Sequence, residues 1–162
     1  MTKENFSAEY ATIYKDLYKM ALYTLGNEED AKDMVSETVL DAYKDIGKLR
    51  DDTKFRSWIF KILSNKCKRK IKEYISVRDF FIELDENTPF YDKSSDDKVL
   101  LEQAYKAISK KERLIINMIV VAGFNSRETA KILFMKDTTV RSIYSRALKK
   151  MQSSIEGGYY EG

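Results

Sequence analysis

Apolar residues recur every three or four positions through most of the chain, which is the period of an amphipathic α-helix. The pattern runs through residues 10–25, 31–46 and 55–71, and it returns from residue 97 to about residue 153. Only six Gly and one Pro interrupt it. Since β proteins need many more turn residues than this, the pattern predicts an all-α fold.

Cap residues mark the ends of the predicted helices. Gly26 fits the position just after a helix, and Asn27 fits the N-cap of the next one. Residues 109–112 (Ser-Lys-Lys-Glu) and 125–128 (Asn-Ser-Arg-Glu) have the form of capping boxes. These signals predict three helices in each half of the chain, with a further short one starting near residue 97.

The charge pattern divides the chain into two basic ends and an acidic middle. Residues 79–99 hold seven acidic and two basic residues, several aromatic residues and the one Pro. We therefore predict two small helical domains, 1–75 and 97–153, joined by an acidic flexible linker, 76–96, with a disordered tail, 154–162. A plain solvated tether is an equally good interpretation of the linker.

Composition excludes several kinds of chemistry. The chain has one cysteine, Cys67, and no histidine, so we expect no disulfide, no metal site and no cofactor. It shows no phosphate loop and no nucleophile–base pair, so we expect it not to be an enzyme. The polar N-terminus and the lack of a long apolar stretch predict a cytoplasmic protein that does not insert into a membrane.

Two surfaces have the residue types of a DNA interface. The last two helices, joined by a short turn, have the layout of a helix-turn-helix, whose second helix enters the major groove. The side chains that can reach DNA from that helix are Thr138, Thr139, Arg141, Ser142, Tyr144, Ser145, Arg146 and Lys149. The helix near residues 61–72 carries a run of positive charge without an acidic residue. Its candidates for phosphate contact are Lys61, Asn65, Lys68, Arg69 and Lys72.

Four segments resemble, in the right order and spacing, the extracytoplasmic-function (ECF) sigma factors of RNA polymerase. Residues 29–38 are similar to the family's polymerase-binding helix and residues 55–62 to its promoter-melting helix. Residues 104–113 and 123–151 are similar to its −35-recognising domain. The resemblance spans roughly residues 8–152. It departs from the family at Phe134, where a Gly is usual, and at Ile143 and Leu148, where Arg is frequent, so a different −35 sequence is expected.

The resemblance implies an alternative sigma subunit that directs initiation at a stress or envelope-response regulon. The −35 element would be read by the helix-turn-helix candidates. The −10 element would be read, and the DNA opened, by the basic helix and by Lys54, Arg56, Ser57 and Trp58. Trp58 also fits the apolar stripe, so a place in the core is the alternative. Core RNA polymerase would be bound by Asp30, Asp33, Glu37 and Asp41.

The resemblance also implies that the linker runs through the polymerase and that an anti-sigma factor, often membrane-anchored in this family, controls the chain. We expect that inhibitor to cover both domains at once. A different interpretation is a two-domain helix-turn-helix regulator that acts without polymerase docking. That interpretation explains the C-terminal half equally well, but it gives no reason for the basic, aromatic helix in the N-terminal half.

Limited proteolysis tests the division into domains. We expect the first cuts within residues 76–96, where the helical period is lost, and two resistant fragments on either side. Mass spectrometry of the early fragments gives the cut sites. First cuts inside residues 38–62 would contradict the predicted domains.

Overall fold

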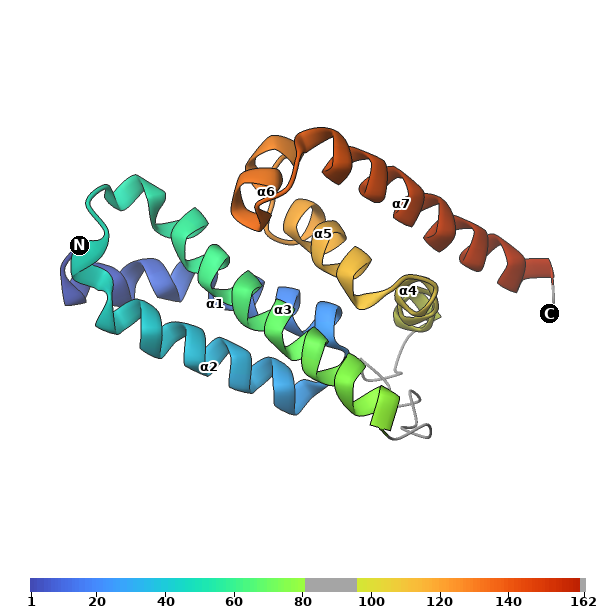
Figure 1. The fold of residues 1–162 in the computed structure, drawn as a ribbon, viewed down its shortest axis with the longest axis horizontal. Coiled ribbons are helices and arrows are strands. Elements are labelled where there is room, and N and C mark those ends of the chain that lie inside the picture. The colour runs from blue at the N-terminus through green and yellow to red at the C-terminus, as the bar shows by residue number, and fades with distance from the viewer. Residues whose placement is uncertain (81–95, 161–162) are drawn as a thin grey trace.

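The computed structural model describes residues 1–80 and 96–160, and in these ranges it contains helices and loops but no strand. The all-α prediction is therefore confirmed. Figure 1 shows α2, α3 and α7 running roughly along the long axis of the molecule and α4 end-on, with the N-terminus at one end and the C-terminus at the other. The elements are α1 (Lys3–Leu25), α2 (Glu28–Lys44), the 3₁₀ turns η1 (Ile46–Lys48) and η2 (Asp52–Lys54), α3 (Phe55–Phe80), α4 (Asp96–Lys106), α5 (Lys110–Val120), α6 (Ser126–Leu133) and α7 (Asp137–Tyr160).

The N-terminal half is a bundle of α1, α2 and α3. Gly26 ends α1 in the left-handed conformation at φ 70°, which a Gly adopts without steric cost. Asn27 then caps α2 by accepting a hydrogen bond from the backbone of Asp30. Both predicted caps are confirmed. Because the two caps are adjacent, the turn between α1 and α2 is short and the two helices run antiparallel. Helix α3 packs across both of them.

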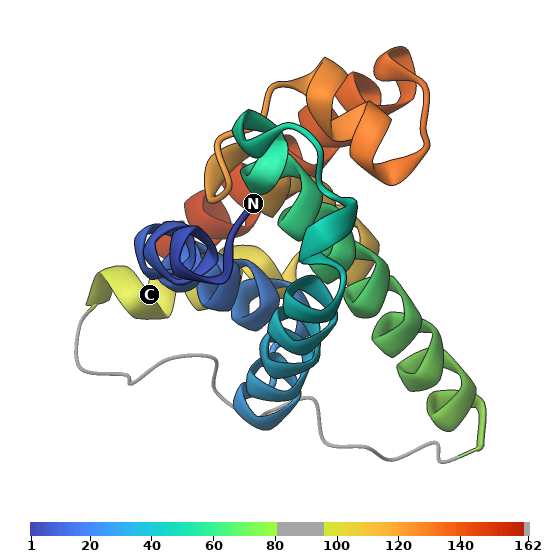
Figure 2. The ribbon, with the colours of Figure 1, turned by 90° about the vertical axis from the view of Figure 1, so that its left-hand side faces the viewer.

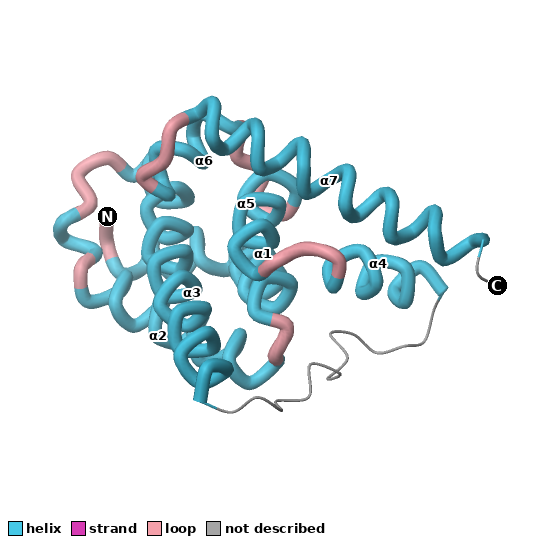
Figure 3. The backbone as a smooth tube through the Cα atoms, turned by 45° about the vertical axis from the view of Figure 1, so that its right-hand side comes forward, coloured by secondary structure: helices cyan, strands magenta, loops and turns pink. Residues whose placement is uncertain are grey.

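The C-terminal half consists of α4 to α7. Both predicted capping boxes are present, at Ser109 with Glu112 and at Asn125 with Glu128. The turn between α6 and α7 is made by Phe134, a bulky residue in the left-handed region at φ 56° and ψ 47°. Figure 3 shows α4 and the second half of α7 side by side, beyond the three-helix bundle.

Two predicted boundaries were wrong. Helix α3 continues through Phe80, so residues 76–80 of the expected linker are helical, and the rest of that linker lies outside the described residues. Helix α7 continues through Tyr160, so residues 154–160 do not form the expected disordered tail. The amide of Gln103 in α4 donates to the carbonyl of Ser154 at 2.9 Å, and the Ser154 hydroxyl donates to the Gln103 carbonyl at 3.3 Å. Packing against α4 thus extends α7.

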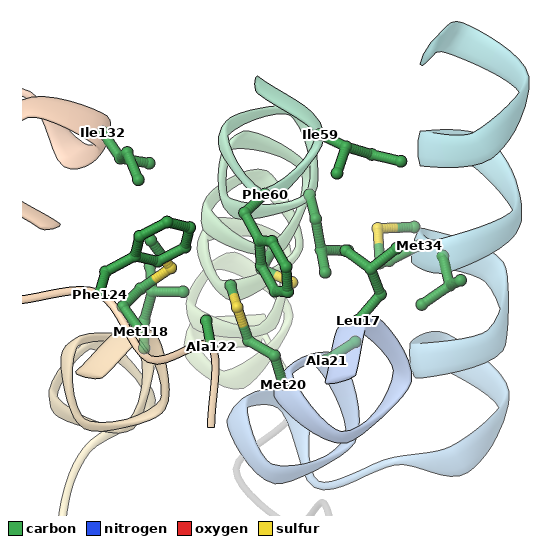
Figure 4. Packing of buried hydrophobic residues seen from close by; sticks show 14 of the residues in the cluster. Leu17, Met20, Ala21, Met34, Ile59, Phe60, Met118, Ala122, Phe124 and Ile132 are labelled. Carbon is green, nitrogen blue, oxygen red and sulfur yellow. The ribbon is translucent and has the colours of Figure 1, made fainter. Parts of the chain in front are cut away.

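The two halves pack on each other through a continuous apolar core. Helix α5 lies against α1, and α6 lies against α3, as Figure 2 also shows. In Figure 4, Met118 and Phe124 of the C-terminal half meet Met20 of α1 and Phe60 of α3. The rings of Phe60 and Phe124 stand edge to face with centroids 5.5 Å apart. Met20, Phe60 and Met118 are fully buried, so this part of the domain interface is apolar core.

Candidate nucleic-acid interface

Helix α7 presents the predicted helix-turn-helix residues on its outer face. Buried Val140 and Ala147 anchor the opposite face of the helix in the domain. Tyr144 is half-buried, because its ring packs against the buried apolar residues of the domain. It therefore lies at the border between the outer face of α7 and its buried side. The other candidates are all exposed: Thr138, Thr139, Arg141, Ser142, Ser145, Arg146 and Lys149.

The two arginines of this face are held only loosely. The guanidinium of Arg141 lies 3.3 Å from the carboxylate of Asp137, one turn earlier. Arg146 donates from Nε to the carbonyl of Ser142 at 3.4 Å. Exposed ion pairs of this kind contribute little to stability, so both guanidinium groups can exchange these partners for bases or phosphates.

The basic face of α3 divides into an open part and a covered part. Asn65, Arg69 and Lys72 are exposed, as is Lys54 in the turn before the helix. The side chains of Arg56, Lys61 and Lys68 instead contact the C-terminal domain. Burial, and then repulsion from Lys72, lower the pKa of Lys68.

Two further residues at the start of α3 have local partners. The Ser57 hydroxyl donates to the carbonyl of Lys54 at 3.1 Å and ties the start of the helix to the turn before it. Trp58 is half-buried against the core, with its ring centroid 6.3 Å from that of Phe55. The indole is therefore packed against the core and still partly accessible from the surface.

The acidic face of α2 depends on a buried lysine of α3. Lys66 is almost fully buried, and its ammonium lies 2.7 Å from the carboxylate of Asp41 and 3.5 Å from that of Glu37. The hydrogen bond from Lys66 lowers the pKa of Asp41. Both carboxylates remain half-exposed, and Asp33 lies exposed one turn before Glu37.

Asp30 has a different environment from the other three carboxylates. It faces α3, where the hydroxyl of Tyr74 donates to it and the ammonium of Lys70 lies 3.6 Å away. Its carboxylate therefore fastens α2 to α3.

Sequence reasoning missed one residue of the acidic face. Leu40 is 60% exposed and lies between Glu37 and Asp41, where it interrupts the acidic residues with an apolar side chain. The sequence contains a signal for this exposure. The apolar stripe of α2 includes Val39 but not Leu40, so Leu40 is expected to face away from the core. A single exposed leucine is ordinary on a protein surface, but its place among these carboxylates adds an apolar contact to the acidic face.

A cavity of about 560 Å³ lies between the two domains, bounded by α3, α5, α7 and the α6–α7 turn. Its floor is apolar and its rim is basic. The floor consists of Ile71, Leu114, Ile115, Leu133, Met135 and Ile143. The rim consists of Lys68, Lys72, Lys111, Arg146 and Lys150, with Glu112 as its acidic member. Glu112 is already paired with Lys150 at 3.1 Å, so the cavity mouth is strongly positive.

Cys67 lies fully buried in α3, where burial raises the pKa of its thiol to about 12. The thiol therefore stays protonated and unreactive in the folded chain. Among the described residues no cluster of Cys, Asp and Glu could hold a metal ion. Within the same ranges no helix is long and apolar enough to cross a membrane.

Comparison with protein families matches both halves of the chain. Residues 10–74 match sigma-70 region 2, and residues 98–151 match sigma-70, region 4. The ECF RNA polymerase sigma factor SigM of Mycobacterium tuberculosis is 23% identical over 143 residues, covering 85% of this chain and 70% of SigM. The RNA polymerase sigma factor SigV of Bacillus subtilis is 26% identical over 144 residues, covering 87% of this chain and 85% of SigV.

Two solved structures share the fold. One is the sigma factor RpoE in complex with the anti-sigma factor NepR from Bartonella quintana, with a TM-score of 0.78 and 23% identity over 94% of this chain and 98% of that one. The other is CnrH in complex with the cytosolic domain of CnrY, with a TM-score of 0.69 and 20% identity over 96% of this chain and 90% of that one.

The two matched regions, in this order and on this fold, define a sigma-70 protein that contains regions 2 and 4. The chain belongs to the ECF sigma factors. It is thus an alternative sigma factor that binds RNA polymerase and promoter DNA, and the predicted division into two helical domains is confirmed.

Proposed function

We propose that three surfaces divide the work of initiation: α7 reads the −35 element, α3 with the turn before it reads and opens the −10 element, and α2 docks on core polymerase. The observation that carries this proposal is the separation of charge. Exposed cations lie on α7 and α3, while exposed carboxylates lie on α2. The chain acts by binding alone, without a catalytic step of its own, and works in the cytoplasm, where the polymerase is.

The −35 assignment predicts that Arg141→Ala and Arg146→Ala weaken promoter binding and leave core-polymerase binding intact. A bidentate guanine contact would contribute about 1–3 kcal/mol, so its loss would weaken binding about five- to a hundredfold. Loss of a phosphate contact would instead weaken binding to all DNA sequences alike. It would also lower, by about one, the slope of the logarithm of the binding constant against the logarithm of the salt concentration. Fluorescence anisotropy with promoter duplexes at several salt concentrations separates the two cases.

Lys98→Ala is the matched control, because Lys98 is an exposed cation of the same domain that lies on α4, away from the proposed DNA surface. Unchanged promoter affinity in both arginine variants would mean that another helix reads the −35 element.

The −10 assignment rests on the exposed cations of α3 and on the partly accessible indole at its start. Arg69 and Lys72 would hold phosphates of the nontemplate strand, since both are exposed cations. Trp58 packs against the core and is only partly accessible, so we assign its ring mainly to the core and its accessible part to the margin of the −10 site. Lys54, Ser57 and Asn65 complete the polar surface around it.

The polymerase assignment includes Asp33, Glu37, Asp41 and Leu40 and leaves out Asp30, whose carboxylate is engaged by α3. Full burial of a leucine contributes about 1.5–3 kcal/mol. We therefore expect Leu40→Ala and Asp33→Lys each to weaken core-polymerase binding about tenfold. Run-off transcription with purified core polymerase should fall in parallel and recover at high sigma concentration.

Glu9→Lys makes the same charge change as Asp33→Lys on an exposed position of α1 and should transcribe normally. Wild-type transcription from the Asp33 and Leu40 variants at limiting concentration would mean that a surface other than this face of α2 docks on core polymerase.

An anti-sigma factor that covers both domains is the regulator we propose for this chain. Its support is the cavity between the domains, whose apolar floor and basic rim fit an amphipathic helix with acidic flanks. Such a helix would cover Lys72 and Arg146 together, and thus block both promoter elements at once. Of the two structural relatives, RpoE was solved in complex with the anti-sigma factor NepR and CnrH in complex with the cytosolic domain of CnrY.

Affinity capture from resting cells tests this regulation. We expect a smaller stoichiometric protein to be recovered with the chain, and Lys111→Glu to release it. Lys111 lies on the cavity rim and outside the proposed DNA surfaces, so promoter binding should persist. Lys15→Glu makes the same charge change on α1 and should retain the partner. Recovery of core polymerase alone, from cells in which the chain is fully active without induction, would exclude an anti-sigma factor.

A further inference from the structure

The cavity between the two domains has the size and the lining of a small-molecule site. Its volume of about 560 Å³ falls within the range of about 300–1,000 Å³ that is usual for ligand pockets. Helices of both domains bound it, and its floor consists of aliphatic and methionine side chains alone. Leu114 and Leu133 in that floor are buried, so the floor is built on the packed interior of the chain.

The charge at the cavity mouth selects the kind of ligand. Five cations stand around the floor, and the one carboxylate among them, that of Glu112, is already paired with Lys150 at 3.1 Å. Within the described residues, no carboxylate pairs with Lys72 or Lys111. This excess of positive charge beside an apolar floor favours a molecule with an apolar body and one anionic end.

Lys68 gives electrostatic support for an anion at the mouth. Its ammonium donates to the carbonyl of Leu133 at 3.1 Å, which holds it beside the floor. Burial, and then repulsion from Lys72, lower the pKa of Lys68. An anion near these two lysines would offset their repulsion, so its binding would stabilise the folded chain.

The lining does not suit a nucleotide or a sugar. The described residues that line the cavity include no aromatic side chain, so a planar base would have no ring to stack on. The floor side chains carry no hydroxyl or amide that could recognise the polar groups of a sugar. Half-buried Met135 and Ile143 instead suit an alkyl chain, since the unbranched methionine side chain adapts readily to the shape of its neighbours.

We propose that this cavity binds a medium-chain fatty-acid anion, with the alkyl chain on the apolar floor and the carboxylate at the basic rim. Arg146 of α7 can take a carboxylate in a bidentate manner, and Lys72 of α3 and Lys111 of α5 add positive charge around it. The anti-sigma helix proposed above would use the same floor, so the fatty acid and that helix exclude each other. This consequence rests on the proposed anti-sigma binding, whereas the ligand site rests on the cavity alone.

Displacement of the fluorescent fatty acid dansylamino-undecanoate from the full chain, below micellar concentrations, tests the site. Each CH₂ group that enters an apolar site tightens binding about fourfold. We therefore expect affinity to rise from octanoate through decanoate to laurate, and to level off once the chain is longer than the floor. Lauryl alcohol, which has the chain of laurate without its charge, should bind about tenfold more weakly.

Two variants locate the ligand in the cavity. Lys111→Ala removes a rim cation and should weaken laurate binding about two- to fivefold, as expected for an exposed ion pair. Ile143→Trp fills part of the floor and keeps the rim charge, so it should weaken laurate binding about tenfold. Lys131→Ala changes an exposed cation of α6 that does not line the cavity, and it should bind laurate as wild type does.

Equal laurate affinity in wild type, Lys111→Ala and Ile143→Trp would overturn the inference. So would an affinity that keeps rising through palmitate and stearate, which marks non-specific detergent binding. Circular dichroism verifies that each variant is folded, and should Ile143→Trp unfold the chain, Lys111→Ala and the chain-length series decide. Because the purified chain is tested without a partner protein, a negative result here leaves the proposed anti-sigma binding standing.

Discussion

Phe60 and Phe124 meet edge to face at the junction of the two domains, and the guanidinium of Arg56 lies over both rings. The apolar surface buried around this contact is what holds α5 and α6 against α1 and α3. Burial of apolar area stabilises in proportion to that area and without direction, so it needs the polar contact between Asn117 and Thr24 to fix one arrangement. The covered cations and the cavity with the basic rim both follow from this packing.

Helix α3 connects all the proposed surfaces. Its apolar side is the centre of the core, its basic side is the proposed −10 site, and Lys66 on its flank holds the carboxylates of Glu37 and Asp41 in α2. Because the interior is close-packed, a displacement of α3 would change the spacing of those carboxylates as well. The proposed docking face of α2 and the proposed −10 face of α3 would therefore move together. The C-terminal domain touches that same helix.

Local features of the fold were predictable from sequence, and long-range ones were not. The caps at Gly26, Asn27 and Ser109 depend on residues a few positions away, so the sequence patterns located them correctly. The partner of Arg56 is a carbonyl 66 residues further on, and no periodicity identifies it. The same limit explains why sequence reasoning assigned Arg56 to DNA without a partner in the C-terminal domain, and why it noticed Phe134 only as a departure from Gly.

The distance between the domains tests the central claim most directly. Dyes on Glu9→Cys in α1 and Ser153→Cys in α7, both exposed positions outside the proposed polymerase and DNA surfaces, report this distance by energy transfer, and buried Cys67 with its raised pKa stays unlabelled. The account predicts high transfer in the free chain and a clear drop when core polymerase binds. Equal transfer in the free chain and in the holoenzyme would contradict it.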